Sequence, residues 1–435
     1  MNTHPNGAPP EAKRKGSSIL VASLALFSMF FGAGNLIFPP TLGRNMGSEA
    51  LISFVGFAVT AVGLVLLAAI ATIRVGGTIE ANARHLGPKL ASLFGGIILV
   101  CIGPGLAIPR TAATTHELLA GAFFPGLSPA ITAILFFAVT LLFVIKPSNV
   151  VNNLGKFLTP FLVLSLALII GKAILSPLGP LAETGVTDVL ASSLNEGYQT
   201  MDALAALAFA IVIINDYRSH GETDNAVIAR KTASASIFAA IGLVLVYGGL
   251  MYAGATTSSL GVMNLDRVPL LIFLMKNLAG TIGMVLISLA MILACLTTAI
   301  GLTSTFGDFC ERTSGGRIGA RTWAILCVIV SAAISVLGVD QIVSISAPIL
   351  SAVYPMAIVL IFLNLIGGPL DRRPVHIGAV LGALIPAVDI LVGWMTGTPL
   401  LIGITGDWPL LLQSFYWLIP SACFAAIGLA VSRKR

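Results

Sequence analysis

The sequence predicts an all-α polytopic membrane protein of about 12 transmembrane helices. We expect a 5+5 inverted repeat with broken helices 1 and 6, followed by two C-terminal helices. Three observations predict this fold: the composition, the spacing of long apolar runs, and helix-breaking residues deep within the first and sixth runs. Hydrophobic residues make up 57% of the 435 residues and charged residues only 10%, whereas soluble domains carry about 25% charged residues.

Twelve apolar runs are long enough for helices that cross a hydrocarbon core of ~30 Å at ~1.5 Å per residue. They cover residues 17–42, 48–73, 90–115, 129–145, 157–176, 197–215, 233–256, 281–307, 322–339, 342–366, 375–395 and 410–431. Val268–Met275 is too short to span, so we expect it to form an interfacial or re-entrant helix. An odd number of helices inverts the second repeat. The expected units are a polar tail (1–16), two repeats (17–176 and 195–366) and two accessory helices (375–431).

Lys and Arg residues predict the topology. All but five of the 24 lie on one side of the membrane when twelve spans follow a cytoplasmic N-terminus, so both termini are expected to be cytoplasmic. Arg110, one of the five, is expected to reach the outer interface and snorkel there, and Asp389 is also expected near an interface. The apolar composition makes the lipid bilayer the expected partner. Nucleic acid is not expected, because the basic residues never cluster with aromatic ones.

The first run contains helix-breaking residues near its middle. Lys15 and Arg44 bracket 28 uncharged residues, and Gly32-Ala33-Gly34-Asn35 lies just past their midpoint. Glycine lowers helix propensity, and an opened backbone inside a membrane is tolerated where it lines a cavity or binds a ligand. Free N–H groups after the break would face an anion such as a substrate carboxylate, and free carbonyls before it would face a cation. A close packing face of small residues is the alternative.

The sixth run places a carboxylate at depth. After Asp202 the uncharged stretch Ala203–Ile214 has twelve residues, about 18 Å or little more than half of the hydrocarbon core. Asp202 is therefore predicted near the midplane, and we take it and Thr200 just before it as candidate substrate-binding residues. Intramembrane carboxylates are costly and usually functional, so we expect a role with substrate or cation. A misplaced span boundary and a purely structural hydrogen bond are the alternatives.

The eighth run carries hydroxyl groups at its centre. Offsets of three and four residues put the carbonyl of Ala294 beside the hydroxyls of Thr297 and Thr298 on one helical face. Carbonyl and hydroxyl oxygens are the hard ligands that suit Na⁺. The alternative is structural, because threonine in a membrane helix usually bonds to a carbonyl of its own helix.

Three segments resemble a known family. They are F-F-G-A-G-N-L-I-F-P-P-T-L-G at Phe30–Gly43, A-I-P-R-T-A at Ala107–Ala112 and G-Y-Q-T-M-D-A-L at Gly197–Leu204. They look like the bacterial branched-chain amino acid:cation symporter family (LIVCS, BrnQ-type) of the amino acid–polyamine–cation superfamily. The resemblance covers the whole chain. It implies a fold similar to that of sodium-coupled neurotransmitter symporters and a place in the bacterial cytoplasmic (inner) membrane.

The resemblance also implies roles for residues. The amides of Ala33 and Gly34 would hold the substrate carboxylate, and Asn35 would serve a cation site beside the substrate. A second sodium site would be formed by the carbonyls of Ser28 and Phe31 with Ala294, Thr297 and Thr298. Asp202 departs from the symporters, which have a neutral stretch at this point, so it is left as a partner for the substrate ammonium, a cation or a proton.

The predicted function is sodium-coupled uptake of leucine, isoleucine and valine, with the sodium ion as co-transported ligand and no cofactor. Proton coupling, or another small apolar amino acid as substrate, is the alternative. An enzyme is not expected, since no H-E-x-x-H or G-x-S-x-G occurs. The histidines all lie in tails, loops or span ends: His4, His85, His116, His220 and His376. A channel is disfavoured because no ring-forming filter repeat appears.

Overall fold

The computed structural model describes residues 19–145, 149–401 and 408–433, and within them every regular element is a helix. The predicted polar tail (1–16) lies outside the described residues. In chain order the helices are α1 (Ile19–Phe30), α2 (Ala33–Met46), η1 (Gly47–Glu49), α3 (Ala50–Ala58), η2 (Val59–Gly63), α4 (Leu64–Arg74), α5 (Ile79–Asn82), η3 (Arg84–Leu86), α6 (Pro88–Val100), η4 (Cys101–Gly105), α7 (Ala107–Ala122), α8 (Pro129–Ile145), α9 (Asn149–Leu175), α10 (Val189–Tyr198), α11 (Asp202–Ser219), α12 (Asn225–Ala255), α13 (Arg267–Thr313), α14 (Ala320–Ser335), α15 (Val339–Ile366), η5 (Gly368–Leu370), α16 (Arg373–Thr396), α18 (Leu410–Phe415) and α19 (Leu418–Arg433).

The helices follow the twelve apolar runs. Eight helical stretches in the described residues are long and apolar enough to cross a membrane, and three shorter apolar helices have 10–17 residues. The stretch Ala33–Arg74 contains the end of the first run and the whole of the second, and α1 supplies the start of the first. Large apolar side chains such as Leu51, Leu164 and Ile282 are exposed on the surface, as expected where lipid rather than water surrounds the protein.

Both predicted helix breaks are present. The first separates α1 from α2 at Phe31 and Gly32, where Gly32 has an extended backbone. The second separates α10 from α11 at residues 199–201. Met201 there has φ 63°, the only positive φ of a non-glycine residue in the described part of the chain. A side chain in this left-handed region costs of order 1–3 kcal/mol and is typical of functional sites.

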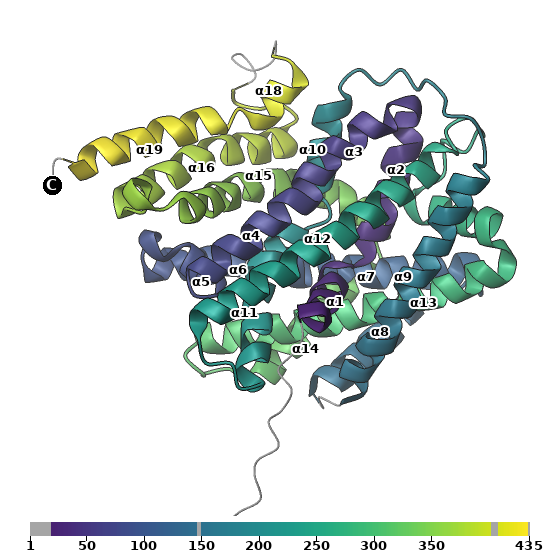
Figure 1. The fold of residues 1–435 in the computed structure, drawn as a ribbon, viewed down its shortest axis with the longest axis horizontal. Helices are drawn as coiled ribbons and strands as arrows, with labels where there is room; N and C mark the ends of the chain where they lie inside the picture. Colours follow the sequence, from purple (N-terminus) through teal and green to yellow (C-terminus); the bar gives the residue numbers. More distant parts are fainter. Residues whose placement is uncertain (1–18, 146–148, 402–407, 434–435) are drawn as a thin grey trace, which may run out of the picture.

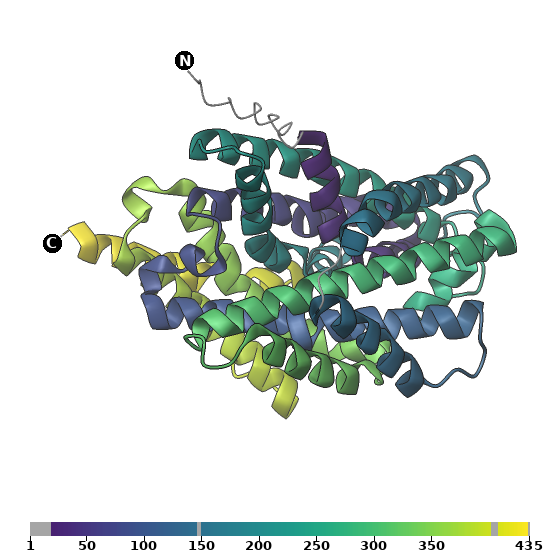
Figure 2. The ribbon, with the colours of Figure 1, turned by 90° about the horizontal axis from the view of Figure 1, so that it is seen from below.

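The short apolar stretch Val268–Met275, before the eighth span, is helical. It forms the start of α13, which Figure 2 shows extending along much of the molecule, and Gly280 (φ 70°, ψ −178°) kinks α13 before the span begins. Only glycine adopts such a backbone readily. The residues from Arg267 to the kink therefore form a separate arm of α13.

The two C-terminal helices pack side by side. In Figure 1, α16 and α19 lie together beside α15 at one edge of the molecule. A Cβ at Gly382 would lie 2.4 Å from the carbonyl oxygen of Pro420, so the small side chain is what permits the close approach. The expected position of Asp389 of α16 near a membrane interface stays a prediction, but within the protein its side chain is enclosed. It is 4% exposed and accepts hydrogen bonds from the amide of Leu401 and the hydroxyl of Tyr416, both 2.8 Å, because the chain after α16 folds back over it.

Candidate functional site

The two helix breaks face each other across a small buried cavity of about 40 Å³. Seven of the predicted site residues line it: Gly32, Ala33, Gly34, Asn35, Thr200, Asp202 and Thr298. They come from the first, sixth and eighth spans, as the predicted fold requires. The volume suffices for about one water molecule and is smaller than an amino acid, so the lining must move apart to admit a substrate.

At the first break, the last backbone carbonyl of α1 has hydrogen-bond donors, whereas the first backbone N–H groups of α2 have no capping side chain. The carbonyl of Phe30 accepts hydrogen bonds from the amide of Gly32 at 2.9 Å and from Asn35 Nδ2 at 2.6 Å. No side chain caps the N-terminus of α2. The first N–H groups of a helix lack partners within the helix and favour negative charge. The amides that follow Gly32 are therefore suited to an anion in the cavity.

At the second break, Asp202 begins α11 and is 3% exposed. Its Oδ2 accepts hydrogen bonds from Asn35 Nδ2 and from the hydroxyl of Tyr247 in α12, both 2.9 Å. Thr200 Oγ1 donates to the carbonyl of Gly197 at 2.9 Å and accepts from the amide of Asp202 at 3.4 Å. Asp202 takes part in none of the ion pairs among the described residues, so this carboxylate has neutral partners only.

Arg110 is a member of the site, and the prediction that it lies at the outer interface is wrong. It is 3% exposed and lines the cavity. Its Nη1 donates to the carbonyl of Gln199 at 2.6 Å and its Nη2 lies 3.5 Å from that of Thr200. The prediction assumed a straight helix from Lys89, but Pro104 and the non-helical backbone of Gly103 break the span before α7 begins. The guanidinium thus satisfies carbonyls that the end of α10 leaves free.

Gly34 provides the space for this guanidinium. A Cβ at Gly34 would lie 2.7 Å from Arg110 Nη2 and 3.1 Å from the ring of Phe38. The guanidinium carbon of Arg110 lies 5.1 Å from the centre of that ring, and the corresponding atom of Arg267 lies 5.6 Å from it. Arg267 also forms ion pairs with Glu196 and Asp340. Charged contacts between α10, α13 and α15 therefore extend from the cavity.

The five residues predicted to bind sodium are only partly brought together. A Cβ at Gly32 would lie 3.9 Å from Thr298 Oγ1, which places this hydroxyl against the first break. Thr297 Oγ1 instead donates to the carbonyl of Ala294 at 3.0 Å, the structural bond named as the alternative. Phe31 lies at the break itself, and Ser28 is half-buried near the end of α1. The five residues remain a predicted site, with Thr298 nearest to the cavity.

Comparison with known proteins identifies the family. A model of the family described as branched-chain amino acid transport protein matches residues 15–435. The chain belongs to this family. The branched-chain amino acid permease BraB of Bacillus subtilis is 35% identical over 94% of each chain. The permease BrnQ of Corynebacterium glutamicum is 34% identical over 95% of each. As a member of this family, the chain is a membrane transporter rather than an enzyme.

Solved structures show the same fold. The closed, bromovinylhydantoin-bound form of Mhp1, a nucleobase-cation-symport-1 family transporter, matches with a TM-score of 0.64 at 13% identity, over 99% of this chain and 96% of that one. MhsT in complex with L-phenylalanine matches with a TM-score of 0.55 at 16% identity, over 97% and 99%. The predicted fold class is confirmed. The boundaries of the two repeats, 17–176 and 195–366, remain predictions.

Arg110 and Tyr247 are hydrogen-bonding members of the site that were not predicted from the sequence. Arg110 stands in the A-I-P-R-T-A segment, which carried the family resemblance but no assigned role. Tyr247 interrupts an otherwise apolar part of α12, G-L-V-L-V-Y-G-G-L. A hydroxyl in such a run needs a partner when it is buried, and that need is a signal for a polar site nearby. This signal in the sequence does not identify Asp202 as the partner of Tyr247.

Proposed function

We propose that this transporter couples inward sodium flux to the uptake of leucine, isoleucine and valine, and that the substrate binds between the two helix breaks. The observation that carries the proposal is the pairing of two complementary ends in one cavity. One is the uncapped N-terminus of α2, which favours an anion. The other is the buried Asp202, whose hydrogen-bond donors are neutral. A zwitterionic amino acid carries the matching carboxylate and ammonium groups.

The carboxylate end has two kinds of donor. The amides of Ala33 and Gly34 open the helix α2, and Arg110 Nη2 lies against Gly34. A guanidinium adds a full positive charge to the partial charge of a helix N-terminus. Binding of a carboxylate here would let Arg110 shift part of its hydrogen bonding from the carbonyls of Gln199 and Thr200 to the substrate.

An apolar wall supports branched-chain substrates. The lining includes the side chains of Met29, Ile102, Ala205, Phe209 and Leu302. Such a surface stabilises an aliphatic side chain by excluding water, and it distinguishes substrates that differ by one methylene by only ~1–3 kcal/mol. We therefore expect leucine, isoleucine and valine to share one site. Another small apolar amino acid would satisfy the same wall.

Sodium coupling is supported by the position of Thr298 against the first break, where the carbonyls of Ser28 and Phe31 are also predicted to contribute. The competing mechanism is proton coupling. It is supported by Asp202, because a buried carboxylate with neutral partners can exchange a proton as the site opens and closes. The membrane placement in the proposal is the bacterial inner membrane with both termini cytoplasmic, supported by the positive-inside distribution of Lys and Arg.

Proteoliposomes test the proposal. Purified protein is reconstituted, and uptake of radiolabelled leucine is measured with an inward sodium gradient, with an inward proton gradient, or with neither. We expect accumulation only with sodium, competition by isoleucine and valine, and leucine exchange without any gradient. Accumulation driven by the proton gradient alone would show that the coupling ion is the proton and not sodium. Absence of exchange in all conditions would refute the substrate assignment.

A further inference from the structure

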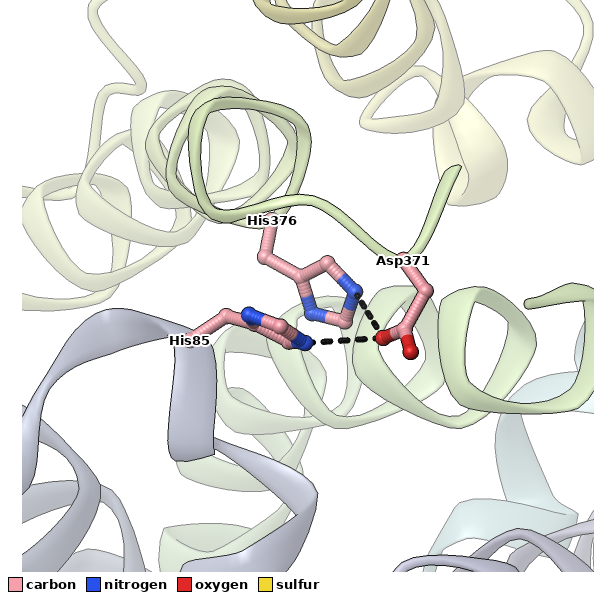
Figure 3. Close-up of side chains that lie close together, drawn as sticks. All are labelled: His85, Asp371 and His376. Carbon is pink, nitrogen blue, oxygen red and sulfur yellow. Dashed lines mark hydrogen bonds and ion pairs between the residues drawn. The ribbon is translucent and has the colours of Figure 1, made fainter. Parts of the chain in front are cut away.

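Three side chains from separate segments meet at a point outside the transport cavity, and none of the three lines that cavity. His85 belongs to η3, Asp371 follows η5, and His376 lies in the first turn of α16 (Figure 3). His85 Nε2 lies 2.8 Å from Asp371 Oδ1, and His376 Nε2 lies 3.7 Å from the same oxygen. One ligand atom from each residue lies within 4.8 Å of the other two. The three side chains therefore converge on one position.

His376 has no partner that explains its orientation. Its side chain is 0% exposed, and neither ring nitrogen has a hydrogen-bond partner in the described part of the chain. Buried polar atoms are nearly always hydrogen-bonded, and exceptions call for an explanation such as a bound ion. Its ring packs against that of His85, with centres 4.4 Å apart. A metal ion between the two Nε2 atoms would give His376 Nε2 the partner that it lacks.

We propose that His85, His376 and Asp371 form a binding site for a divalent transition-metal ion, and that Zn²⁺ is the ion this ligand set suits. Two imidazole nitrogens and one carboxylate oxygen are borderline ligands typical of zinc sites that keep a fourth position for water. With metal–ligand bonds of ~2.0–2.1 Å and tetrahedral angles, neighbouring ligand atoms lie roughly 3.4 Å apart. The observed 2.8 and 3.7 Å lie on either side of this value, and all three ligand atoms lie within 4.8 Å of one another, so side-chain shifts toward a common centre would complete the geometry.

Arg84 fits the site as a partner of the carboxylate rather than as a competitor. Its Nη2 lies 2.8 Å from Asp371 Oδ1 and 3.0 Å from Oδ2. The metal ion would take Oδ1 while Arg84 keeps Oδ2, an arrangement in which an outer hydrogen bond orients the ligand. An aspartate carboxylate is ionised at neutral pH, as a metal ligand must be.

The cost of placing a divalent ion near Arg84 makes us expect an exchangeable ion rather than a permanently bound one. Its ligands would link η3, in the connection between the second and third spans, to the start of α16. These two elements already pack against each other. The bound ion would stabilise that contact.

Cobalt binding tests the site. The full-length protein is purified in detergent through a tag without histidine and treated with a chelator. Co²⁺ is then added while its visible absorption is recorded. We expect one Co²⁺ per chain with a tetrahedral spectrum, displacement by Zn²⁺, and release when the pH falls and the imidazoles are protonated. His85→Gln, His376→Gln and Asp371→Asn should each weaken binding at least ~10-fold, the effect of losing a ligand or its orientation.

His220→Gln is the matched control, because His220 also lies near a carboxylate, 3.6 Å from Asp216, but forms no cluster with a second histidine among the described residues. It should bind Co²⁺ like the parent protein. His376 is buried within helix packing, so the partly exposed His85 and Asp371 carry the test if His376→Gln does not fold. Equal Co²⁺ binding by His85→Gln, Asp371→Asn and the parent would overturn the proposal, as would no saturable binding by the parent.

Discussion

Asn35 and Asp202, 167 residues apart in the chain, are joined by a hydrogen bond of 2.9 Å between Nδ2 and Oδ2. The same amide nitrogen donates at 2.6 Å to the carbonyl of Phe30, the last residue of α1. One side chain thus connects the end of the first half-helix to the start of α11 in the sixth span. A ligand or proton that changes the charge on Asp202 acts directly on the geometry of both breaks.

Replacement of Asp202 by asparagine should raise the KM for leucine about 10- to 100-fold, because a hydrogen bond to a charged group contributes ~1.5–3 kcal/mol. The size of the side chain is kept, and only the charge is removed. The measurement is sodium-driven leucine uptake in proteoliposomes. If Asp202 instead carries a coupling proton, the variant should lose pH-driven uptake and keep leucine exchange.

Asp389→Asn is the control for this experiment. Asp389 is also a buried aspartate that accepts a hydrogen bond from a tyrosine hydroxyl, here Tyr416 at 2.8 Å, but it does not line the cavity. Its replacement should leave the KM unchanged. Parent-like affinity, coupling and pH profile in Asp202→Asn would show that Asp202 is structural.

Gly34→Ala should lower leucine uptake roughly 5- to 150-fold, because the new methyl would lie 2.7 Å from Arg110 Nη2 and overpacking of this kind costs ~1–3 kcal/mol. The guanidinium must shift to relieve the contact, which disturbs its hydrogen bonds to the carbonyls of Gln199 and Thr200. Gly34→Leu should abolish uptake. Gly171→Ala in α9, where no atom lies within 4 Å of the new methyl, should transport normally. Uptake by Gly34→Leu at the parent rate would contradict the placement of substrate at the first break.

Thr298→Val should raise the sodium concentration for half-maximal uptake several-fold, since valine keeps the shape of threonine and removes one oxygen ligand. Leucine uptake is measured as a function of sodium at constant ionic strength. Thr305→Val is the control: Thr305 lies about two turns further along α13, and its hydroxyl donates a hydrogen bond to the carbonyl of Gly301. It should not change the sodium dependence. An unchanged curve in both Thr297→Val and Thr298→Val would assign these hydroxyls a structural role.

Gly43→Ala should lower the thermal unfolding midpoint of the detergent-purified protein. A Cβ there would lie 1.9 Å from the carbonyl oxygen of Met251, where α2 crosses α12. Backbone cannot move aside as a side chain can, and overpacking costs ~1–3 kcal/mol. Gly301→Ala, exposed on α13 with no atom near the new methyl, should leave the midpoint unchanged or raise it, since alanine favours the helix by up to ~1 kcal/mol over glycine. Equal midpoints for the two variants would contradict the observed crossing.

The sequence by itself determined the elements and the positions of the two breaks along the chain. A span is a local property, because the length of an uncharged run sets whether it crosses the membrane. Gly32 to Asn35 lie in the middle of such a run, and the short run after Asp202 requires that carboxylate to be deep. These inferences need only residue order and helix rise. The starts of α2 and α11 agree with the positions of the breaks, and their depth in the membrane stays a prediction.

The tertiary structure alone decided which groups meet. Arg110 was misplaced because counting residues along a span assumes a straight helix, whereas η4 bends at Gly103. The partners of Asp202 and the neighbour of Gly34 depend on how separate helices cross, as does the meeting of His85 with His376. The angle and distance of a crossing result from the packing of many side chains over the whole interface. No single segment of sequence contains that information.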